Sequence, residues 1–250
     1  MADDKTSDAI RLIGIAKPTK RGAASHALLV SMLPEGVRTI VRYSPVKNGT
    51  MEEFEGALPF YEQMTANLAA EGAQLIHLEG TPPFLILGHD AERRTLDDWS
   101  RRFGVPIFTS ATCQANALRA LGVRKLLDVG YDPTTGPVAE AYFRDAGFDV
   151  IAVEKVPVAW GASGDISDND AFDMLGSILR SHPGADGLCL QGSSKWRLSG
   201  LIGRLEDEFG VVVVHPVAAR YWELMHRLGH PAPRQGLGRL LAEMPPMPKS

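Results

Sequence analysis

The chain has few cysteines, no long apolar run and no excess of positive charge. Two cysteines among 250 residues cannot build a disulfide framework, which favours a reducing cytoplasm. No stretch approaches the roughly 20 apolar residues that span a bilayer, and the polar N-terminus lacks the apolar core of a signal peptide. A net charge of −4 argues against a nucleic-acid-binding surface. No CxxC or HExxH motif occurs, so the sequence predicts no metal site, and it predicts neither nucleic-acid nor membrane partners.

A stretch that occurs twice, at residues 73–84 and 185–196, organises the rest of the chain. Each copy is an apolar strand that runs into a glycine, Gly80 or Gly192, and then a hydroxyl residue, Thr81 or Ser193. A glycine there can take a positive φ, and the amides that follow can form an anion-binding nest. Ligands of open α/β sheets sit beyond the carboxyl ends of the strands, so the two strand ends predict one pocket lined by donors. The alternative is a pair of ordinary strand-to-helix turns.

Strands and helices alternate along the chain, which predicts an α/β fold with mostly parallel sheets. The duplication predicts two pseudo-symmetric Rossmann-like lobes with the active site between them. We expect one unit over 10–250, with lobes at 10–115 plus 217–240 and at 116–216, after a flexible end at 1–9. The predicted strands are 12–16, 39–43, 74–79, 105–108, 125–129, 149–153, 187–191 and 211–214. The predicted helices are 25–33, 52–71, 90–103, 112–121, 137–146, 170–181, 198–209 and 217–228. Residues 161–170 are a candidate lid, and the tail from Pro231 is expected to be mostly irregular.

Several segments, in this order, resemble the aspartate/glutamate racemase superfamily, and within it the branch of arylmalonate decarboxylase and maleate cis-trans isomerase. The segments are residues 13–18, Gly80-Thr81, 118–125, Tyr131, Gly192-Ser193 and 236–240. The resemblance implies an enzyme that holds a substrate carboxylate in a nest of amides and hydroxyls and stabilises an enolate-like intermediate. It also implies a homodimer.

The resemblance assigns substrate contacts to both glycine turns and to the first-strand loop. Thr81 with its following amides matches the nest, and so does Tyr131. Pro18 and Thr19 match the loop that touches the substrate. The remaining substrate-binding candidates are Gly80, Pro82, Gly192 and Ser194.

The chain departs from this superfamily at the cysteines. Racemases and maleate isomerases carry a cysteine at each glycine-strand end, and arylmalonate decarboxylase keeps only the second. In this chain the first of the two cysteine positions aligns with Gly80. The second aligns with Gly192, or with Ser193 if the alignment gap is placed one residue differently. Two-thiol racemisation is therefore not expected. Cys113 and Cys189 are interpreted as packing residues, although Cys113 near a helix start has the alternative of a lowered thiol pKa.

Four residues are candidate catalytic groups, and three of them follow the second lobe's strands. Ser193 and Ser194 are candidate nucleophiles or donors, with Ser193 assigned as the catalytic one, and the alternative for both is a helix N-cap. Lys195 is a candidate base, with the alternatives of a carboxylate clamp or a solvated charge. His215 ends the strand at 211–214 and would transfer protons near neutral pH, with the alternative of capping the next helix.

The fourth candidate, Glu79, ends the first glycine strand. It is a general base with a raised pKa, or it pairs with a cation such as Lys17 or Lys20. Lys17, Lys20 and Arg21 in turn attract an anionic substrate or form a solvated loop.

The leading hypothesis is a cofactor-independent lyase or isomerase that acts on a small carboxylate. Thr81, Ser193 and Tyr131 would stabilise the oxyanion or enolate, and a side chain or bound water would move the proton. The second hypothesis is a hydrolase in which Ser193, or water activated by His215, attacks an amide or lactone. The third is a non-catalytic protein that only binds a carboxylate.

Overall fold

Two four-stranded sheets form the framework of the protein. The computed structural model describes residues 10–20, 23–130, 135–157, 166–192 and 196–248. The strands of the first sheet are β1 (Leu12–Lys17), β2 (Arg38–Tyr43), β3 (Leu75–Leu78) and β4 (Ile107–Thr109). Those of the second sheet are β5 (Lys125–Gly130), β6 (Asp149–Lys155), β7 (Gly187–Leu190) and β8 (Val212–Val214).

The two sheets repeat one topology. Their orders are β2-β1-β3-β4 and β6-β5-β7-β8, which are the same order shifted by four strands. Every strand pairing in the two sheets is parallel. The predicted α/β fold with two pseudo-symmetric lobes is therefore confirmed. The proposed lobe boundaries stay a prediction.

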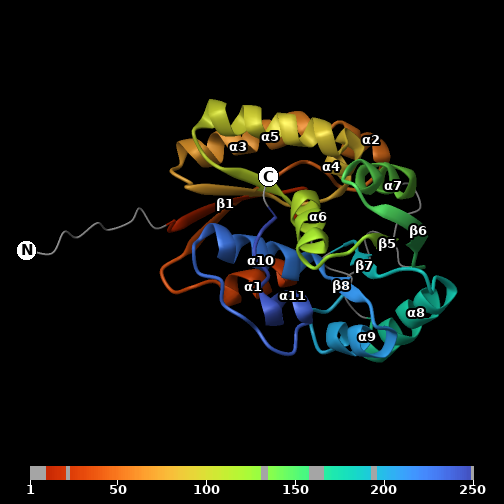
Figure 1. The fold of residues 1–250 in the computed structure, drawn as a ribbon. Coiled ribbons are helices and arrows are strands. Elements are labelled where there is room, and N and C mark those ends of the chain that lie inside the picture. Colours follow the sequence, from red (N-terminus) through yellow and green to blue (C-terminus); the bar gives the residue numbers. More distant parts are fainter. Residues whose placement is uncertain (1–9, 21–22, 131–134, 158–165, 193–195, 249–250) are drawn as a thin grey trace, which may run out of the picture.

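Helices cover both faces of the sheets. They are α1 (Ala23–Met32), α2 (Met51–Glu55), α3 (Leu58–Ala70), α4 (Pro82–Leu87), α5 (His89–Phe103), α6 (Ser110–Ala120), α7 (Gly136–Asp145), α8 (Asp168–Ser181), α9 (Leu201–Phe209), α10 (Pro216–Arg227) and α11 (Arg239–Glu243). Figure 1 shows α3 and α5 over one face of the first sheet, and α1 and α10 on the other side. In the second lobe, α8 and α9 pack together, while α7 packs on β6 and also contacts α4 of the first lobe. The α4–α7 contact helps to bring the carboxyl ends of the two sheets together.

The predicted helices differ from the structure at residues 52–71, at the two short helices α4 and α11, and at the candidate lid. The helix expected over 52–71 is two helices, because Gly56 caps α2 and Pro59, which lacks an N–H, lies in the first turn of α3. The sequence pattern predicts neither α4 nor α11, since six and five residues are too few to show a period. The tail after Pro231 is thus not wholly irregular. Of the candidate lid, 161–165 lies outside the described residues, and Asp168 already begins α8 behind the N-cap Ser167.

Candidate active site

The two glycine turns meet between the lobes. Gly80 follows β3 with φ 103° and Gly192 follows β7 with φ 82°, a region that glycine adopts without steric cost. The residues beside these glycines are hydrogen bonded across the lobes: the Thr81 hydroxyl donates to Gln191 Oε1 at 3.0 Å. Both strand ends therefore line one place, as the repeat predicted.

Pro18 packs against the first glycine turn. A Cβ built on Gly80 would lie 3.0 Å from Pro18 Cγ and 3.0 Å from the Tyr61 hydroxyl oxygen. That hydroxyl is itself held in place, since it donates to the Glu79 carbonyl oxygen at 2.5 Å. Backbone conformation and space thus both require glycine at position 80, and a cysteine side chain would not fit without a shift of its neighbours.

The nest expected after Thr81 is smaller than predicted. Pro82 and Pro83 occupy the next two positions, at the start of α4, and proline has no N–H to donate. The amide of Gly80 donates to Ser110 Oγ at 3.4 Å. The Thr81 N–H is therefore the donor that this turn offers a ligand, joined by the Thr81 hydroxyl only when its proton is released from Gln191, and the prediction of a run of amides is wrong here.

A serine and a histidine lie directly behind the turn, a pair that the sequence did not reveal. Ser110 Oγ is 3.2 Å from His77 Nε2 on β3. Burial lowers the pKa of His77 well below its ordinary value, so the ring is neutral. His77 Nδ1 has no hydrogen-bond partner among the described residues. Without a group that orients the ring, the pair lacks the third member of a nucleophile–base–carboxylate arrangement, and its evident role is to support Gly80.

Glu79 is an ion-pair residue and not a general base. Its carboxylate oxygens lie 3.3 Å from Lys17 Nζ and 2.6 Å from Arg220 Nη1. Burial by itself raises the pKa of this carboxyl, but the Arg220 and Lys17 charges outweigh burial and the net pKa is lowered. The predicted pairing with Lys17 is present, while the predicted base with a raised pKa is wrong. Arg220 contacts Glu79 as a close ion pair, and its three nitrogens have no further hydrogen-bond partner in the described part of the chain.

His215 caps a helix and is not placed to act as a base. Its Nδ1 accepts the Val217 N–H at 3.1 Å, and its Nε2 lies 3.2 Å from the Trp196 carbonyl oxygen, to which it donates. The side chain is buried, and burial lowers the pKa of His215 to about 4. Both ring nitrogens are thus occupied and the ring is neutral at pH 7. The structure supports the capping role, which removes His215 from the proposed hydrolytic mechanism.

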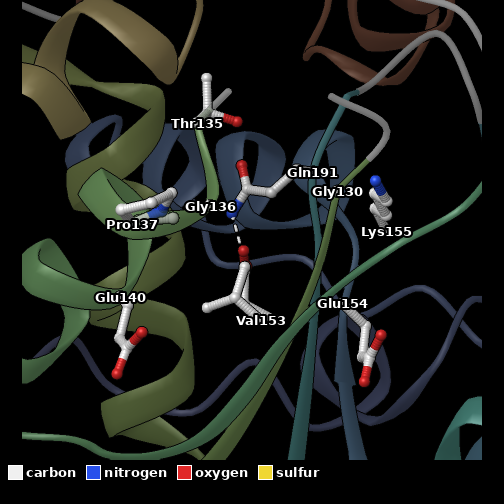
Figure 2. A pocket seen from close by; sticks show the side chains of 11 residues that line it. Gly130, Thr135, Gly136, Pro137, Glu140, Val153, Glu154, Lys155 and Gln191 are labelled. Atoms are coloured by element: carbon white, nitrogen blue, oxygen red, sulfur yellow. Dashed lines mark hydrogen bonds between the residues drawn. The ribbon is translucent and has the colours of Figure 1, made fainter. Parts of the chain in front are cut away.

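A cavity of about 360 Å³ opens at the carboxyl ends of β5 and β6. Figure 2 shows Gln191 beside Gly136 at the start of α7, with its hydrogen bond as a dashed line. That bond runs from Gln191 Nε2 to Asp128 Oδ1 at 2.8 Å. Asp128 is 1% exposed, and burial raises the pKa of its carboxyl to about 7. Asp128 is not among the site residues predicted from the sequence, and the available signal was one charge in the otherwise apolar strand segment 126–129.

A second cavity, of about 670 Å³, lies by the first-strand loop. Thr19 and Lys20 line it together with Tyr43, Val46 and Phe60. Its walls are therefore partly apolar and partly basic. Thr19 follows Pro18, the residue that packs against the glycine turn.

Five candidate residues lie outside the described part of the chain: Arg21, Tyr131, Ser193, Ser194 and Lys195. Their assigned roles stay predictions. Cys113 and Cys189 are both fully buried, and burial raises the pKa of each thiol well above its ordinary value. The interpretation of both as packing residues is confirmed.

The described residues contain neither a metal-binding cluster nor a membrane-spanning helix. No group of three or more His, Cys, Asp or Glu side chains lies close enough to hold a metal ion. No described helix has the length and apolar character needed to cross a membrane.

Comparison with known proteins gives consistent matches. The model of the arylmalonate decarboxylase family matches residues 13–241. An arylmalonate decarboxylase from Bordetella bronchiseptica is 24% identical over 197 residues, covering 78% of this chain and 82% of that protein. A crystal structure of arylmalonate decarboxylase has a TM-score of 0.79 at 23% identity and covers 93% of this chain and 99% of that one. A Nocardia farcinica maleate cis-trans isomerase variant with a covalently bound succinylcysteine intermediate has a TM-score of 0.75 at 19% identity, covering 93% and 98%.

Proposed function

Because the chain belongs to the arylmalonate decarboxylase family, in the branch of the aspartate/glutamate racemase superfamily that includes the maleate isomerases, we propose that it is a cofactor-independent lyase or isomerase of small carboxylates. One observation carries the proposal. The Thr81 hydroxyl and the Gln191 amide, from opposite lobes, lie 3.0 Å apart beside two glycines of positive φ. This arrangement supports a single reaction site shared by both lobes.

The charges behind the turn favour an anionic substrate. Lys17 and Arg220 contribute two positive charges against the single negative charge of Glu79, and all three side chains are buried. Charges with little access to water act over longer distances than surface charges do. The excess positive charge therefore supports a carboxylate at the N–H and hydroxyl of Thr81.

Decarboxylation of a malonate-type substrate would proceed as follows. The bond between the α-carbon and one carboxylate breaks, and carbon dioxide leaves. The electron pair passes into the remaining carboxylate as an enediolate, whose developing charge the fixed Thr81 donors meet. A proton then returns to the α-carbon. In isomerisation, a nucleophile, for which Ser193 is the candidate, would add to one alkene carbon. The electron pair of the double bond would pass into the adjacent carboxylate as an enediolate held by the same donors. After rotation about the resulting single bond, the electron pair would return and expel the nucleophile, which restores the double bond.

The proton in this proposal does not come from a thiol. Both cysteines are fully buried and neither lines a described cavity, so neither presents its S–H to a substrate there. Ser193, Lys195 and bound water remain the proposed donors. The cavity by Thr19, with Tyr43 and Phe60 in its wall, supports a substrate that also carries an apolar group.

Proton NMR in D₂O with maleate, substituted malonates and amide-bearing carboxylates tests the proposal. We expect loss of a carboxylate, isomerisation, or deuterium at an α-carbon, and a large loss of that turnover in Thr81→Val. Hydrolysis products alone would instead support the hydrolase, and Ser193→Ala would then abolish turnover. Ligand-induced stabilisation without any conversion would overturn the proposal in favour of a binding protein.

A further inference from the structure

Three side chains form a continuous hydrogen-bonded chain from the second lobe to the first. The Gln191 Nε2 donates to Asp128 Oδ1 at 2.8 Å, and the Thr81 hydroxyl donates to Gln191 Oε1 at 3.0 Å. All three residues are buried, at 1%, 6% and 9% exposure for Asp128, Gln191 and Thr81. We refer to these three residues as the relay.

An ionised Asp128 fixes the direction of every hydrogen bond in the relay. A carboxylate only accepts, so Gln191 must turn its NH₂ group toward Asp128 and its carbonyl oxygen toward Thr81. The Thr81 hydroxyl then donates its single proton to the Gln191 carbonyl oxygen and has no other proton to donate. Toward the pocket it presents lone pairs, which repel a substrate carboxylate.

A protonated Asp128 reverses the relay. Its O–H donates to the Gln191 carbonyl oxygen, the amide turns over, and the NH₂ group donates to the Thr81 oxygen. The Thr81 proton is then free to bond a substrate carboxylate. We propose that Asp128, acting through Gln191, is a positioning residue that controls whether the Thr81 hydroxyl donates to the substrate. The inference rests on the proposed function, in that it takes Thr81 as the carboxylate contact.

The surroundings of Asp128 place this reversal near neutral pH. Burial is the largest influence, and it raises the pKa of Asp128 to about 7. The titratable and charged groups around it are Cys189 of β7, Glu140 of α7, and Glu154 and Lys155 of β6. Glu140 forms an ion pair with Arg144, and Glu154 Oε1 lies 2.8 Å from Nε2 of the titratable His182. The helix α4, which packs on α7, carries no ionisable residue. Among these carboxyls, Asp128 is therefore the one that is hydrogen bonded to Gln191.

Binding of phenylacetate between about pH 5.5 and 8.5 tests the relay, because the carboxyl of this probe stays ionised throughout that range. We expect the affinity of the wild-type protein to fall by roughly ten- to a hundredfold as pH rises through 7, the worth of one hydrogen bond to a charged group. Asp128→Asn and Gln191→Met should each bind independently of pH. Thr81→Val should bind weakly at every pH, while Thr81→Ser, which keeps the hydroxyl, should keep the pH dependence.

The matched control is Glu154→Gln, which removes a carboxylate from the same cavity but leaves the three relay residues unchanged. The affinity of this variant for phenylacetate should keep the wild-type pH dependence. Thermal melting of each variant confirms that it is folded. A pH dependence that survives in folded Asp128→Asn, or that Glu154→Gln abolishes, would overturn the inference. The proposed function fails separately: if the expected pH pattern appears but no substrate is converted, the relay stands and the enzyme assignment does not.

Discussion

Replacing Glu79 with glutamine should destabilise the fold strongly. The glutamine is nearly isosteric but uncharged, so the buried Lys17 and Arg220 would lose the negative charge of Glu79. Removing one partner of a buried ion pair costs about 3–5 kcal/mol. For a chain of this size each kcal/mol lowers the melting temperature by roughly 2–4 °C, so we expect a fall of about 6–20 °C.

A double-mutant cycle isolates the contribution of the pair from that of packing. Arg220→Met replaces the guanidinium with an apolar side chain of similar length, and Glu79→Gln/Arg220→Met then has no unpaired arginine. We expect the double variant to be more stable than Glu79→Gln alone, measured by urea unfolding at pH 7. If the losses of unfolding free energy in the two single variants add up to the loss in the double variant, the two side chains do not interact.

The pH dependence of stability gives an independent check. The folded pKa of Glu79 lies below its ordinary value of 4.5. The pair therefore contributes its full stability above about pH 4.5, and this stability is lost as pH falls through the lower, folded pKa. The difference between wild type and Glu79→Gln should shrink on the acid side. If Glu79→Gln kept the wild-type melting temperature but lost one limb of the pH–rate profile, this reasoning would be refuted. Glu79 would then be the general base.

Two further predictions concern the buried carboxyl Glu92 and the turn at Gly80. Glu92 accepts hydrogen bonds from Thr109 and Tyr142, and burial raises its pKa from 4.5 to about 7. Its folded pKa is above the unfolded one, so stability should fall by roughly 3 kcal/mol as pH rises from about 4.5 to 7, and Glu92→Gln should flatten this slope in urea unfolding at pH 5 and pH 8. Gly80→Ala should cost about 1–3 kcal/mol from its positive φ alone, with more from the contact with Pro18, and a melting temperature equal to wild type would contradict the tight turn.

The sequence predicted the architecture well because its signals are local. Eight apolar runs bounded by glycine, proline and polar clusters correspond to the eight strands. The repeated strand–glycine–hydroxyl pattern located the meeting point of the lobes, since a glycine before a new element marks the carboxyl end of a strand. The short helices α4 and α11 left no such signal, because one turn of helix shows no period.

The chemistry of individual side chains was harder to predict because it depends on distant partners. Glu79 reads as a base or as a pair member until Arg220, from the last long helix, is seen beside it. His215 looks available at a strand end, but the carbonyl of Trp196 and the amide of Val217 occupy its ring. The two prolines after Thr81 were visible in the sequence, and their missing N–H groups could have limited the predicted nest without any structure.

The duplicated turns show how one backbone serves two kinds of chemistry. Glu79 and Gln191 occupy the same position in the two repeats, each directly before its glycine. On the neighbouring strands, His77 is paired with Ile15 in the first lobe, whereas Cys189 is paired with Asp128 in the second.

These neighbours determine which residue each position can hold. In the first lobe two buried cations require a carboxylate at position 79. In the second lobe a carboxylate at position 191 would lie beside Asp128, and two like charges in one buried site would suppress ionisation of both. An amide avoids that repulsion, and because it both donates and accepts it can connect Asp128 to Thr81 in either direction. The replacement of glutamate by glutamine at position 191 is thus what allows the second lobe to act on the first in this proposal.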